Sequence, residues 1–460
     1  MVLSDVFDRF VAKTPLAVMA RSLLERILDP DTVNRLFHKN ANAQYTRELT
    51  FSSVVDLMGR VVTSAFPSVR AAHIDKSSGI SVSLTSLYNK LQGIEPVVSR
   101  SLVQHVASQL QPLIQSSGGA LPEMIPGYEM YILDGNALAG TEHRLPETRD
   151  SSAAPLPGKS LCLYRPAYQL ITDVIPCEDG HTQERSLVAP ILEGLQKNHL
   201  LVADRNFCFQ SFLVGIINKL AYFVIRQHSG LNINVDSELR HCGWSDTGEV
   251  FEQDINIIDE CGTVHKLRRI VVRLKQATED GDCEIAILTN LPESVSALLV
   301  SDVYRKRWSI EGGFLDLTTT LGCEIKTLCY PQASLFVFCV AVMAYNMLGA
   351  IQGVVRAEHG AEKVEKELSR YYMVDEIGQV YRGMMVAVPV DDWEMIREMS
   401  FDEFVEFLRG LARNIDLDRY RKSRRGPKKK KPPRKHDPSR PHVSVAKLLR
   451  ARKANKATRE

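Results

Sequence analysis

The chain has 460 residues, of which 44% are hydrophobic and 24% are charged, and its formal net charge is +2. This length predicts two or three domains, and the hydrophobic fraction is that of an ordinary globular protein, which excludes a disordered or fibrous class. The longest apolar stretch, 335–348, is shorter than the roughly 18 residues of a membrane span, and no signal-peptide pattern opens the chain. We therefore expect a cytoplasmic protein without a membrane partner, with 335–348 as a buried helix.

The small net charge conceals a strong asymmetry along the chain. Residues 419–460 hold 18 Lys and Arg against two acidic residues, a net charge of +16, whereas the rest of the chain carries −14. This basic tail cannot bury a core and is expected to be disordered in isolation. Its charge predicts a polyanionic partner such as DNA, bound without sequence readout and with strong salt dependence. A solvated tail that only aids solubility is the alternative.

None of the nine cysteines forms a Cys-x-x-Cys pair, so a structural zinc site is not expected. Cys208 and Cys339 lie within apolar runs. This placement is typical of reduced thiols in the core of a cytoplasmic protein.

Residues 1–118 are predicted to form an all-helical N-terminal domain. Apolar residues recur at three- and four-residue spacing, as in 17–24. Farther along, Ser81 or Ser83 could cap a short helix, which would resemble one helix of a DNA-reading helix-turn-helix. An ordinary amphipathic helix of a bundle is the alternative. The outer face of this helix would present Thr85, Ser86, Asn89 and Lys90.

Residues 126–350 are predicted to form an α/β domain with a mixed sheet, because short apolar runs alternate with helical patterns. A β-rich stretch at about 229–292 looks inserted into this domain. A helical C-terminal region, 351–418, follows with helices at 361–371 and 401–413. The other expected elements are strands at 130–134, 160–164, 169–176, 200–204 and 222–227, and helices at 184–197, 209–220, 301–321 and 335–355.

Three acidic residues suit a two-metal site. Asp134 and Asp204 each close a short apolar run, so each is expected at the end of a buried strand, where open α/β sheets bind ligands. Glu311 is expected on the helix 301–321. Together they could hold two Mg²⁺ ions, which take hard oxygen ligands, for chemistry on the phosphodiesters of nucleic acid. The alternative is that the two Asp are turn or cap residues and that Glu311 is surface charge.

The blocks around these residues resemble the DDE transposases of the insertion-sequence-four family of bacterial mobile elements. The first block is Asp134-Gly135-Asn136 with 140–145, and the second is 203–207. The third resembles the signature Tyr-x₂-Arg-x₃-Glu-x₆-Lys, in which Tyr304, Arg307 and Glu311 match and Thr318 stands at the Lys position. The N-terminal segments 51–58 and 83–91 also resemble the helical region of the family.

The resemblance implies an RNase H-like catalytic domain with a β insertion between Asp204 and Glu311. It implies that Asp134, Asp204 and Glu311 bind two Mg²⁺ ions, with Mn²⁺ able to substitute. The activity implied is excision of an insertion sequence from DNA and its transfer into target DNA, on nucleoid DNA in a bacterial cytoplasm. The enzyme would act as a homodimer that pairs the terminal inverted repeats of the element, and close relatives excise through a hairpin.

Residues near the proposed ligands are candidate DNA contacts. Tyr304 and Arg307 would lie at i−7 and i−4 on the Glu311 helix, on one face. The resemblance implies that they contact DNA-end phosphates, for which the Arg fork is suited; an Arg307–Glu311 ion pair within the helix is the alternative. Lys306 and Arg307 are alternatives for the missing signature Lys. His143, Arg144 and Arg205 flank the Asp residues, where local loop hydrogen bonding is the alternative.

Trp244 and Trp308 are candidate platforms for a flipped-out base, which aromatic side chains can hold. For both, a place in the core is the favoured interpretation.

Three functions remain open at this point. The first is an active cut-and-paste transposase, and the second is a nuclease of the same fold that only hydrolyses DNA or RNA. The third is a DNA-binding protein without turnover, in which Thr318 marks decay. End-specific cleavage and strand joining separate the first from the others.

Overall fold

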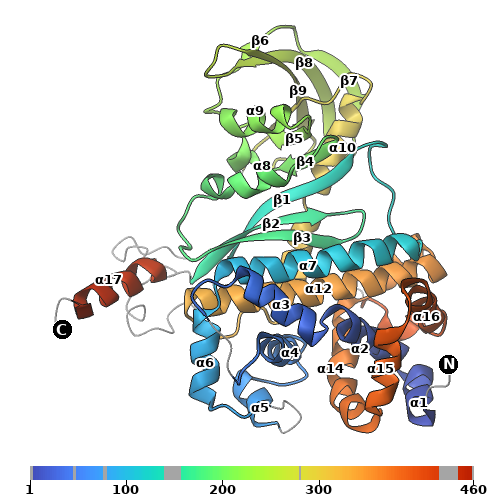
Figure 1. Cartoon of the computed structure of the whole chain (residues 1–460). Coiled ribbons are helices and arrows are strands. Elements are labelled where there is room, and N and C mark those ends of the chain that lie inside the picture. The colour runs from blue at the N-terminus through green and yellow to red at the C-terminus, as the bar shows by residue number, and fades with distance from the viewer. Residues whose placement is uncertain are drawn as a thin grey trace.

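The computed structural model describes residues 4–44, 48–75, 80–138, 157–278, 281–423 and 444–457. A twisted sheet stands on a base of helices, with α7 and α12 lying directly beneath β3 and β2 (Figure 1). The other N-terminal helices and most of the C-terminal ones gather on the far side of these two helices, whereas α17 stands apart (Figure 1).

The N-terminal helices begin at side-chain caps and bury their apolar faces. Ser4, Thr50, Ser68 and Ser83 each accept a hydrogen bond from a backbone N–H of the first turn that follows, which satisfies a donor that the helix itself leaves free. The helices are α1 (Asp5–Lys13), α2 (Pro15–Ile27), α3 (Pro30–Asn40), α4 (Phe51–Val62), α5 (Val69–Ile74), α6 (Leu84–Gly93) and α7 (Pro96–Ser116).

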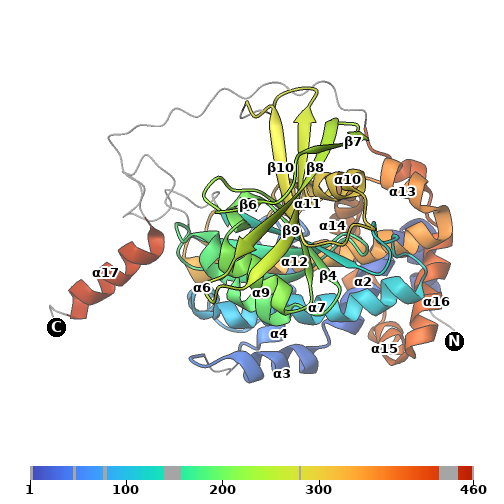
Figure 2. The same cartoon turned by 90° about the horizontal axis from the view of Figure 1, so that it is seen from above.

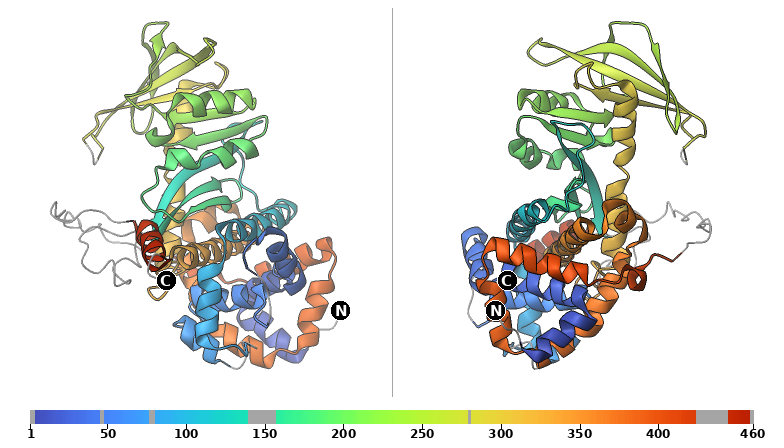
Figure 3. Two further views of the ribbon diagram at one scale, coloured as in Figure 1. Left: turned by 60° about the vertical axis from the view of Figure 1, so that its left-hand side comes forward. Right: turned by 90° about the vertical axis from the view of Figure 1, so that its right-hand side faces the viewer.

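The C-terminal helices pack among the N-terminal ones in a single hydrophobic core. α2 contacts α12, α14, α15 and α16, and α4 contacts α12. The N-terminal helices and the C-terminal helices α12 and α14–α16 are therefore interleaved in space, as Figure 3 also shows. These elements are α12 (Pro331–His359), α13 (Ala361–Glu367), α14 (Arg370–Ala387), α15 (Val390–Glu398), α16 (Phe401–Arg413) and the 3-10 turn η5 (Leu417–Tyr420). The last helix, α17 (Val445–Ala457), lies apart from them (Figure 1).

The central helix α12 is the apolar helix that the sequence predicted. It is long and apolar enough to cross a bilayer, but its apolar window is completely buried by protein. In its middle, Asn346 accepts a hydrogen bond from the backbone N–H of Ile171 and donates one to the carbonyl of the same residue, both at 2.8 Å. Ile171 belongs to β3, the edge strand of the sheet. Asn346 therefore provides hydrogen-bond partners for the outward backbone N–H and carbonyl of Ile171, with which no described strand pairs.

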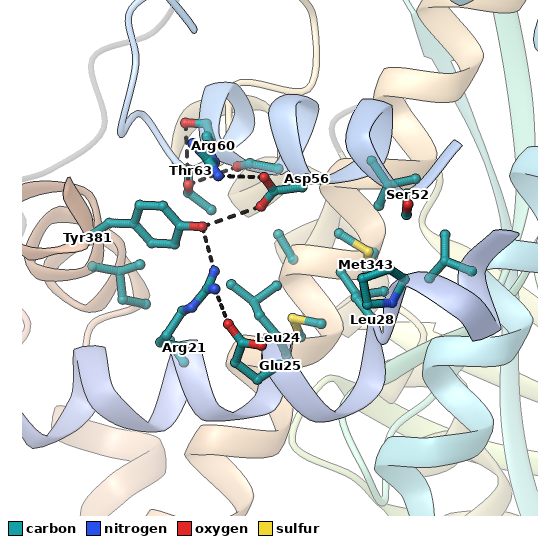
Figure 4. A pocket seen from close by; sticks show the side chains of 18 of the residues that line it. Arg21, Leu24, Glu25, Leu28, Ser52, Asp56, Arg60, Thr63, Met343 and Tyr381 are labelled. Carbon is teal, nitrogen blue, oxygen red and sulfur yellow. Dashed lines mark hydrogen bonds and ion pairs between the residues drawn. The ribbon is translucent and has the colours of Figure 1, made fainter. Parts of the chain in front are cut away.

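A polar network joins α2 and α4 to α14 (Figure 4). Arg21 donates to the hydroxyl of Tyr381 at 2.7 Å and pairs with Glu25, while Arg60 donates to Asp56 at 2.6 Å. These groups line a cavity of about 530 Å³ whose floor is apolar. Because its charged lining groups pair with one another, we assign no ligand to it.

In the described part of the chain, ten strands form one sheet in the order β3-β2-β1-β4-β5-β10-β9-β8-β6, with β7 paired to β8. β1, β4 and β5 are parallel, and the other pairs are antiparallel. The strands are β1 (Glu129–Leu138), β2 (Gly158–Arg165), β3 (Leu170–Cys177), β4 (His199–Ala203), β5 (Tyr222–Arg226), β6 (Asn234–Val235), β7 (Arg240–Trp244), β8 (Gly248–Ile258), β9 (Val264–Leu274) and β10 (Glu284–Thr289).

Both faces of the central sheet are covered. In β4, Leu200 and Val202 face the core with α7 and α10–α12, whereas Leu201 and Ala203 face the smaller core with α8 and α9. This burial explains why the strand is apolar at every position after His199, as central parallel strands are. Figure 3 shows the two helix groups on opposite sides of the strands. The helical elements are η3 (Glu184–Leu187), α8 (Ala189–Gly194), η4 (Arg205–Phe207), α9 (Gln210–Asn218), α10 (Ala297–Lys306) and α11 (Ser309–Thr319).

The mixed sheet confirms the predicted α/β class and is consistent with an RNase H-like fold. The strands predicted within 229–292 are present as β8, β9 and β10. They do not form a separate sheet, because β10 pairs with β5 and so extends the same sheet outward (Figures 1 and 2).

Three predicted helices differ from the observed ones. The helix 184–197 is instead η3 and α8, because Pro190 lies near the start of α8 and Gly194 at its end. The helix 361–371 is broken at Leu368, which bridges to Arg421 in an extended conformation. The helix 301–321 is divided into α10 and α11.

Part of the basic tail also differs from the prediction of a segment without structure. Residues Val445–Ala457 form α17. This segment consists mainly of Ala, Leu, Lys and Arg, which are strong helix formers. Cys208 and Cys339 are buried free thiols, as the sequence predicted.

Candidate functional site

Asp134 and Asp204 are neighbours because their strands are parallel and in register. Leu133 of β1 lies opposite Ala203, the last residue of β4. The residues that follow these two, Asp134 and Asp204, therefore lie side by side. Asp204 lies just beyond β4, as predicted, and accepts a hydrogen bond from the backbone N–H of Asn206 at 2.8 Å. Asp134 does not end its strand. β1 continues to Leu138 because its pairing with β2 extends past the end of the β4 ladder.

Asp134 lies in an environment that disfavours its charge. Its side chain is only 16% exposed. Burial raises the pKa of this carboxyl to about 7; Arg307 opposes that shift, whereas the nearby charges of Asp204 and Glu184 add to it. A backbone N–H of Gly135 donates to Asp134 Oδ1 at 2.9 Å. A buried carboxylate in such surroundings favours a bound cation, which would lower the cost of its charge.

Glu311 is linked to Asp134 by one guanidinium. Arg307 Nη1 lies 2.8 Å from Asp134 Oδ2, and Arg307 Nη2 lies 3.2 Å from Glu311 Oε1. The Arg307–Glu311 ion pair that was the alternative interpretation is therefore present, but it extends to Asp134. The structure thus gathers Asp134, Asp204 and Glu311 around Arg307.

Arg307 does not lie within one long helix with Tyr304 and Glu311, as predicted. α10 ends at Lys306 and α11 begins at Ser309. At this junction the backbone N–H of Ile310 bonds to the carbonyl of Arg307, which is the i→i+3 pattern of a tight 3-10 turn. Regular helical spacing could not reveal this turn, which directs Arg307 toward β1.

Glu184 is a fourth carboxylate that sequence reasoning missed. It is the first residue of η3, and its charge contributes to the raised pKa of Asp134. A Cβ on Gly135 would lie 2.2 Å from Glu184 Oε1, so the carboxylate lies directly against the glycine that follows Asp134. Lys159 Nζ lies 3.8 Å from the same oxygen. Only the Asp134-Gly135 dipeptide could have pointed to this close approach.

The chemistry of these residues fits a divalent cation with oxygen ligands. Asp134, Asp204, Glu184 and Glu311 supply carboxylate oxygens, which Mg²⁺ prefers. Among the described residues, however, no three Asp, Glu, His or Cys side chains are arranged to hold an ion as they stand. Arg307 accounts for this geometry, because its guanidinium lies between Asp134 and Glu311.

The predicted DNA-contact residues differ in their accessibility. Tyr304 is buried, and burial raises the pKa of its hydroxyl. Lys306 and Arg205 are exposed. Arg307 is 8% exposed. Lys306 and Arg205 are therefore accessible to a DNA phosphate, whereas the buried Arg307 would have to move to contact one.

Other predicted contacts lie away from the carboxylates or are not described. Asn89 is exposed on α6, whereas Lys90 lies over the ring of Phe37 at 4.3 Å and is half-buried. Ser83, one of the two proposed caps, caps α6. His143 and Arg144 lie outside the described residues.

Trp244 and Trp308 are not core residues, which corrects the favoured interpretation. They are 64% and 61% exposed, respectively. Trp308 lies beside the carboxylates, with the guanidinium carbon of Arg307 at 4.9 Å from its ring centroid. Their sequence context was misleading because Trp308 lies at the turn between two helices and Trp244 ends the peripheral strand β7.

Residues 137–347 match the family described as the transposase DDE domain. The match includes Asp204 and Glu311 and begins three residues after Asp134. It supports a DDE transposase, an enzyme class that cleaves and transfers DNA. No match was found among curated proteins.

Proposed function

Given the match to a transposase DDE domain, we propose that this chain is a DNA transposase of the insertion-sequence-four family. It excises a bacterial insertion sequence and joins the element to target DNA. The observation that carries the proposal is the convergence of Asp134 and Asp204, on neighbouring parallel strands, with Glu311 linked through Arg307. Asp204 and Glu311 lie within the residues that match the DDE domain, and Asp134 lies three residues before the match begins.

The carboxylates of Asp134, Asp204 and Glu311 are the proposed ligands of two Mg²⁺ ions, for which Mn²⁺ can substitute. When bound, such a pair activates an attacking oxygen and stabilises a leaving one. The protein's part is to bring the three carboxylates together and to keep Asp134 partly shielded from water. Because Asp134 must lose its proton to act as a ligand, its raised pKa predicts that cation affinity rises with pH through about 7.

The surface around the carboxylates supports DNA as the substrate. Lys306 and Arg205 are exposed nearby, and Tyr304 and Arg307 adjoin them. Asn89 and Lys90 on α6, together with His143 and Arg144, are the proposed contacts farther along the DNA. The basic tail adds affinity for phosphates without reading sequence. Two copies of the chain, one on each terminal inverted repeat, make up the proposed complex in the cytoplasm.

Thr318 is the observation that favours a second candidate, a DNA-binding protein of this fold without turnover. Its hydroxyl bonds to the carbonyl of Phe314 within α11, so it cannot replace a lysine that reaches a phosphate. Lys326 is exposed beyond the end of α11, and Lys306 is exposed at its start. The catalytic proposal requires Lys306 or Arg307 to supply the missing contact.

The test is cleavage of end-labelled DNA that carries the element's terminal repeat, with Mg²⁺ or Mn²⁺, by wild type and by Glu311→Gln. The transposase proposal expects metal-dependent cutting at the element boundary, joining to a second DNA, and loss of both in the variant. Hairpin products would identify the excision route. Cutting without joining would indicate a nuclease, and binding without cutting in either metal would indicate the protein without turnover.

A further inference from the structure

Arg307 lies between Asp134 and Glu311, two of the three proposed metal ligands. Its side chain is 9% exposed and pairs with both carboxylates. Burial disfavours its charge, but Asp134, Glu311 and Asp204 more than offset this effect, and the pKa of the guanidinium is raised. The Arg307 guanidinium is therefore the counter-ion of the acidic cluster formed by Asp134, Asp204 and Glu311.

A carboxylate oxygen that faces a guanidinium at 2.8 Å cannot also ligate a divalent ion on the same side without displacing it, because the two cations repel each other at this range. A cation that binds through Asp134 Oδ2 or Glu311 Oε1 therefore competes with Arg307 in its present position. A second partner for Arg307 would thus open the site to the ion.

We propose that Arg307 is a gate that keeps divalent cations out of the site until a DNA phosphate draws its guanidinium away from Asp134 and Glu311. This inference rests on the proposed function and adds a regulation to it. The enzyme would hold its catalytic ions in the DNA complex and lose them when DNA leaves.

Several features of the structure suit Arg307 to this movement. The residue lies at the turn between α10 and α11, not inside either helix. Its Nε is buried and makes no hydrogen bond with any described residue, so the present position leaves one donor unused. A phosphate accepts two parallel hydrogen bonds from an Arg fork, and the exposed neighbours Lys306 and Trp308 mark the side from which DNA can approach.

With such a gate, cation binding strengthens DNA binding, and DNA binding strengthens cation binding. If DNA raises the affinity for the ion by a given factor, the ion raises the affinity for DNA by the same factor. Without the guanidinium at residue 307, both effects should become smaller, because only the direct attraction between the ion and the DNA phosphates remains. An arginine that merely positions the carboxylates predicts the opposite for the free protein, namely weaker cation binding once it is removed.

The first measurement is Mn²⁺ binding to the full chain without DNA, from the electron paramagnetic resonance signal of free Mn²⁺. We expect Arg307→Met to bind Mn²⁺ about tenfold or more tightly than wild type, because a unit charge a few ångströms away has a large effect on the ion. Arg307→Lys, which cannot bridge two carboxylates, should fall between. The charge-matched control is Arg305→Met, since Arg305 pairs with Asp246 and Asp302 on the other side of α10.

The second measurement is the affinity for a labelled DNA duplex by fluorescence anisotropy, with and without Ca²⁺ at constant ionic strength. Wild type and Arg305→Met should bind DNA more tightly with Ca²⁺, and this gain should be smaller in Arg307→Met. Equal or weaker Mn²⁺ binding by Arg307→Met, compared with wild type, would overturn the gate. If Asp204→Asn left Mn²⁺ binding unchanged in every background, the proposed metal site itself would fail, and the gate with it.

Discussion

The carboxylate of Glu184 lies where the side chain of residue 135 would otherwise be. A Cβ on Gly135 would come within 2.2 Å of Glu184 Oε1 and 2.5 Å of its carboxyl carbon. The absence of a side chain at residue 135 therefore brings a fourth carboxylate beside Asp134. Glu184, the first residue of η3, therefore belongs to the group of carboxylates around Asp134.

Gly135→Ala is expected to push the Glu184 carboxylate aside and to weaken Mn²⁺ binding. The free energy of unfolding should change by less than about 1 kcal/mol, because the clashing atoms are the end of a flexible side chain. Mn²⁺ titration and urea unfolding measure the two effects. Gly410→Ala, in open space on α16, is the control and should stabilise the protein by about 0.5–1 kcal/mol. Unchanged Mn²⁺ affinity in Gly135→Ala would mean that Glu184 has no part in the site.

Asp134→Asn is expected to make the metal-free protein more stable at alkaline pH. The pKa of Asp134 is about 7 in the folded state, above its ordinary value, so the folded state holds this proton more tightly than the unfolded state. Stability from this group is then greatest in acid and is lost as pH rises through about 7. Thermal and urea unfolding with a chelator should show a gain of about 1–3 kcal/mol at pH 8 that shrinks toward pH 5.

Asp391→Asn, on the exposed side of α15, is the control for this substitution. A destabilised Asp134→Asn protein at pH 8 would show that the ion pair with Arg307 outweighs the burial of the carboxylate.

Asn346→Leu is expected to destabilise the fold although it preserves most of the side-chain volume. The substitution removes both hydrogen bonds to Ile171 and leaves a buried N–H and a buried carbonyl on the edge strand β3 without a partner. The free energy of unfolding should fall by about 2–5 kcal/mol, as each buried unsatisfied group costs about 1–3 kcal/mol. Gln379→Ala, whose amide bonds only to exposed Asp375, should cost under about 0.5 kcal/mol. Equal losses in the two variants would contradict the edge-capping role.

Removal of residues 424–460 is expected to weaken binding to nonspecific DNA and to reduce its dependence on salt. The segment contains 15 Lys and Arg against two acidic residues. For each phosphate that the shortened chain no longer neutralises, the slope of log affinity against log salt should become shallower by about 0.9. Anisotropy titrations with random-sequence duplexes from low to physiological salt measure the slope. If the slope stayed the same, the tail would not bind DNA.

The sequence was sufficient for the parts of the fold that depend on local pattern. Strand β4 was predictable because a short uninterrupted apolar run bounded by polar residues is typical of a buried strand, and helix α16 because its apolar residues recur with the helix period. The pairing of Asp134 with Asp204 followed from two apolar runs that each end in an aspartate. Their side-by-side position requires only that the two strands be parallel neighbours.

What the sequence could not reveal depends on contacts between distant residues. The break at Leu368 results from pairing with Arg421. The turn at Arg307 accompanies an ion pair with Asp134, 173 residues away. Glu184 joins the site only because η3 folds back over Gly135. None of these contacts produces a periodic pattern in the amino-acid sequence.

The network of Figure 4 has a consequence for synthesis. Arg21 and its partner Tyr381 are separated by 360 residues, which a ribosome needs roughly 20–70 s to translate at about 5–20 residues per second. During this interval α2 and α4 have neither α12 nor α14 to cover their apolar faces. The helical base is therefore completed only after nearly all of the chain has emerged, and the apolar faces of the nascent N-terminal helices stay without these partners until then.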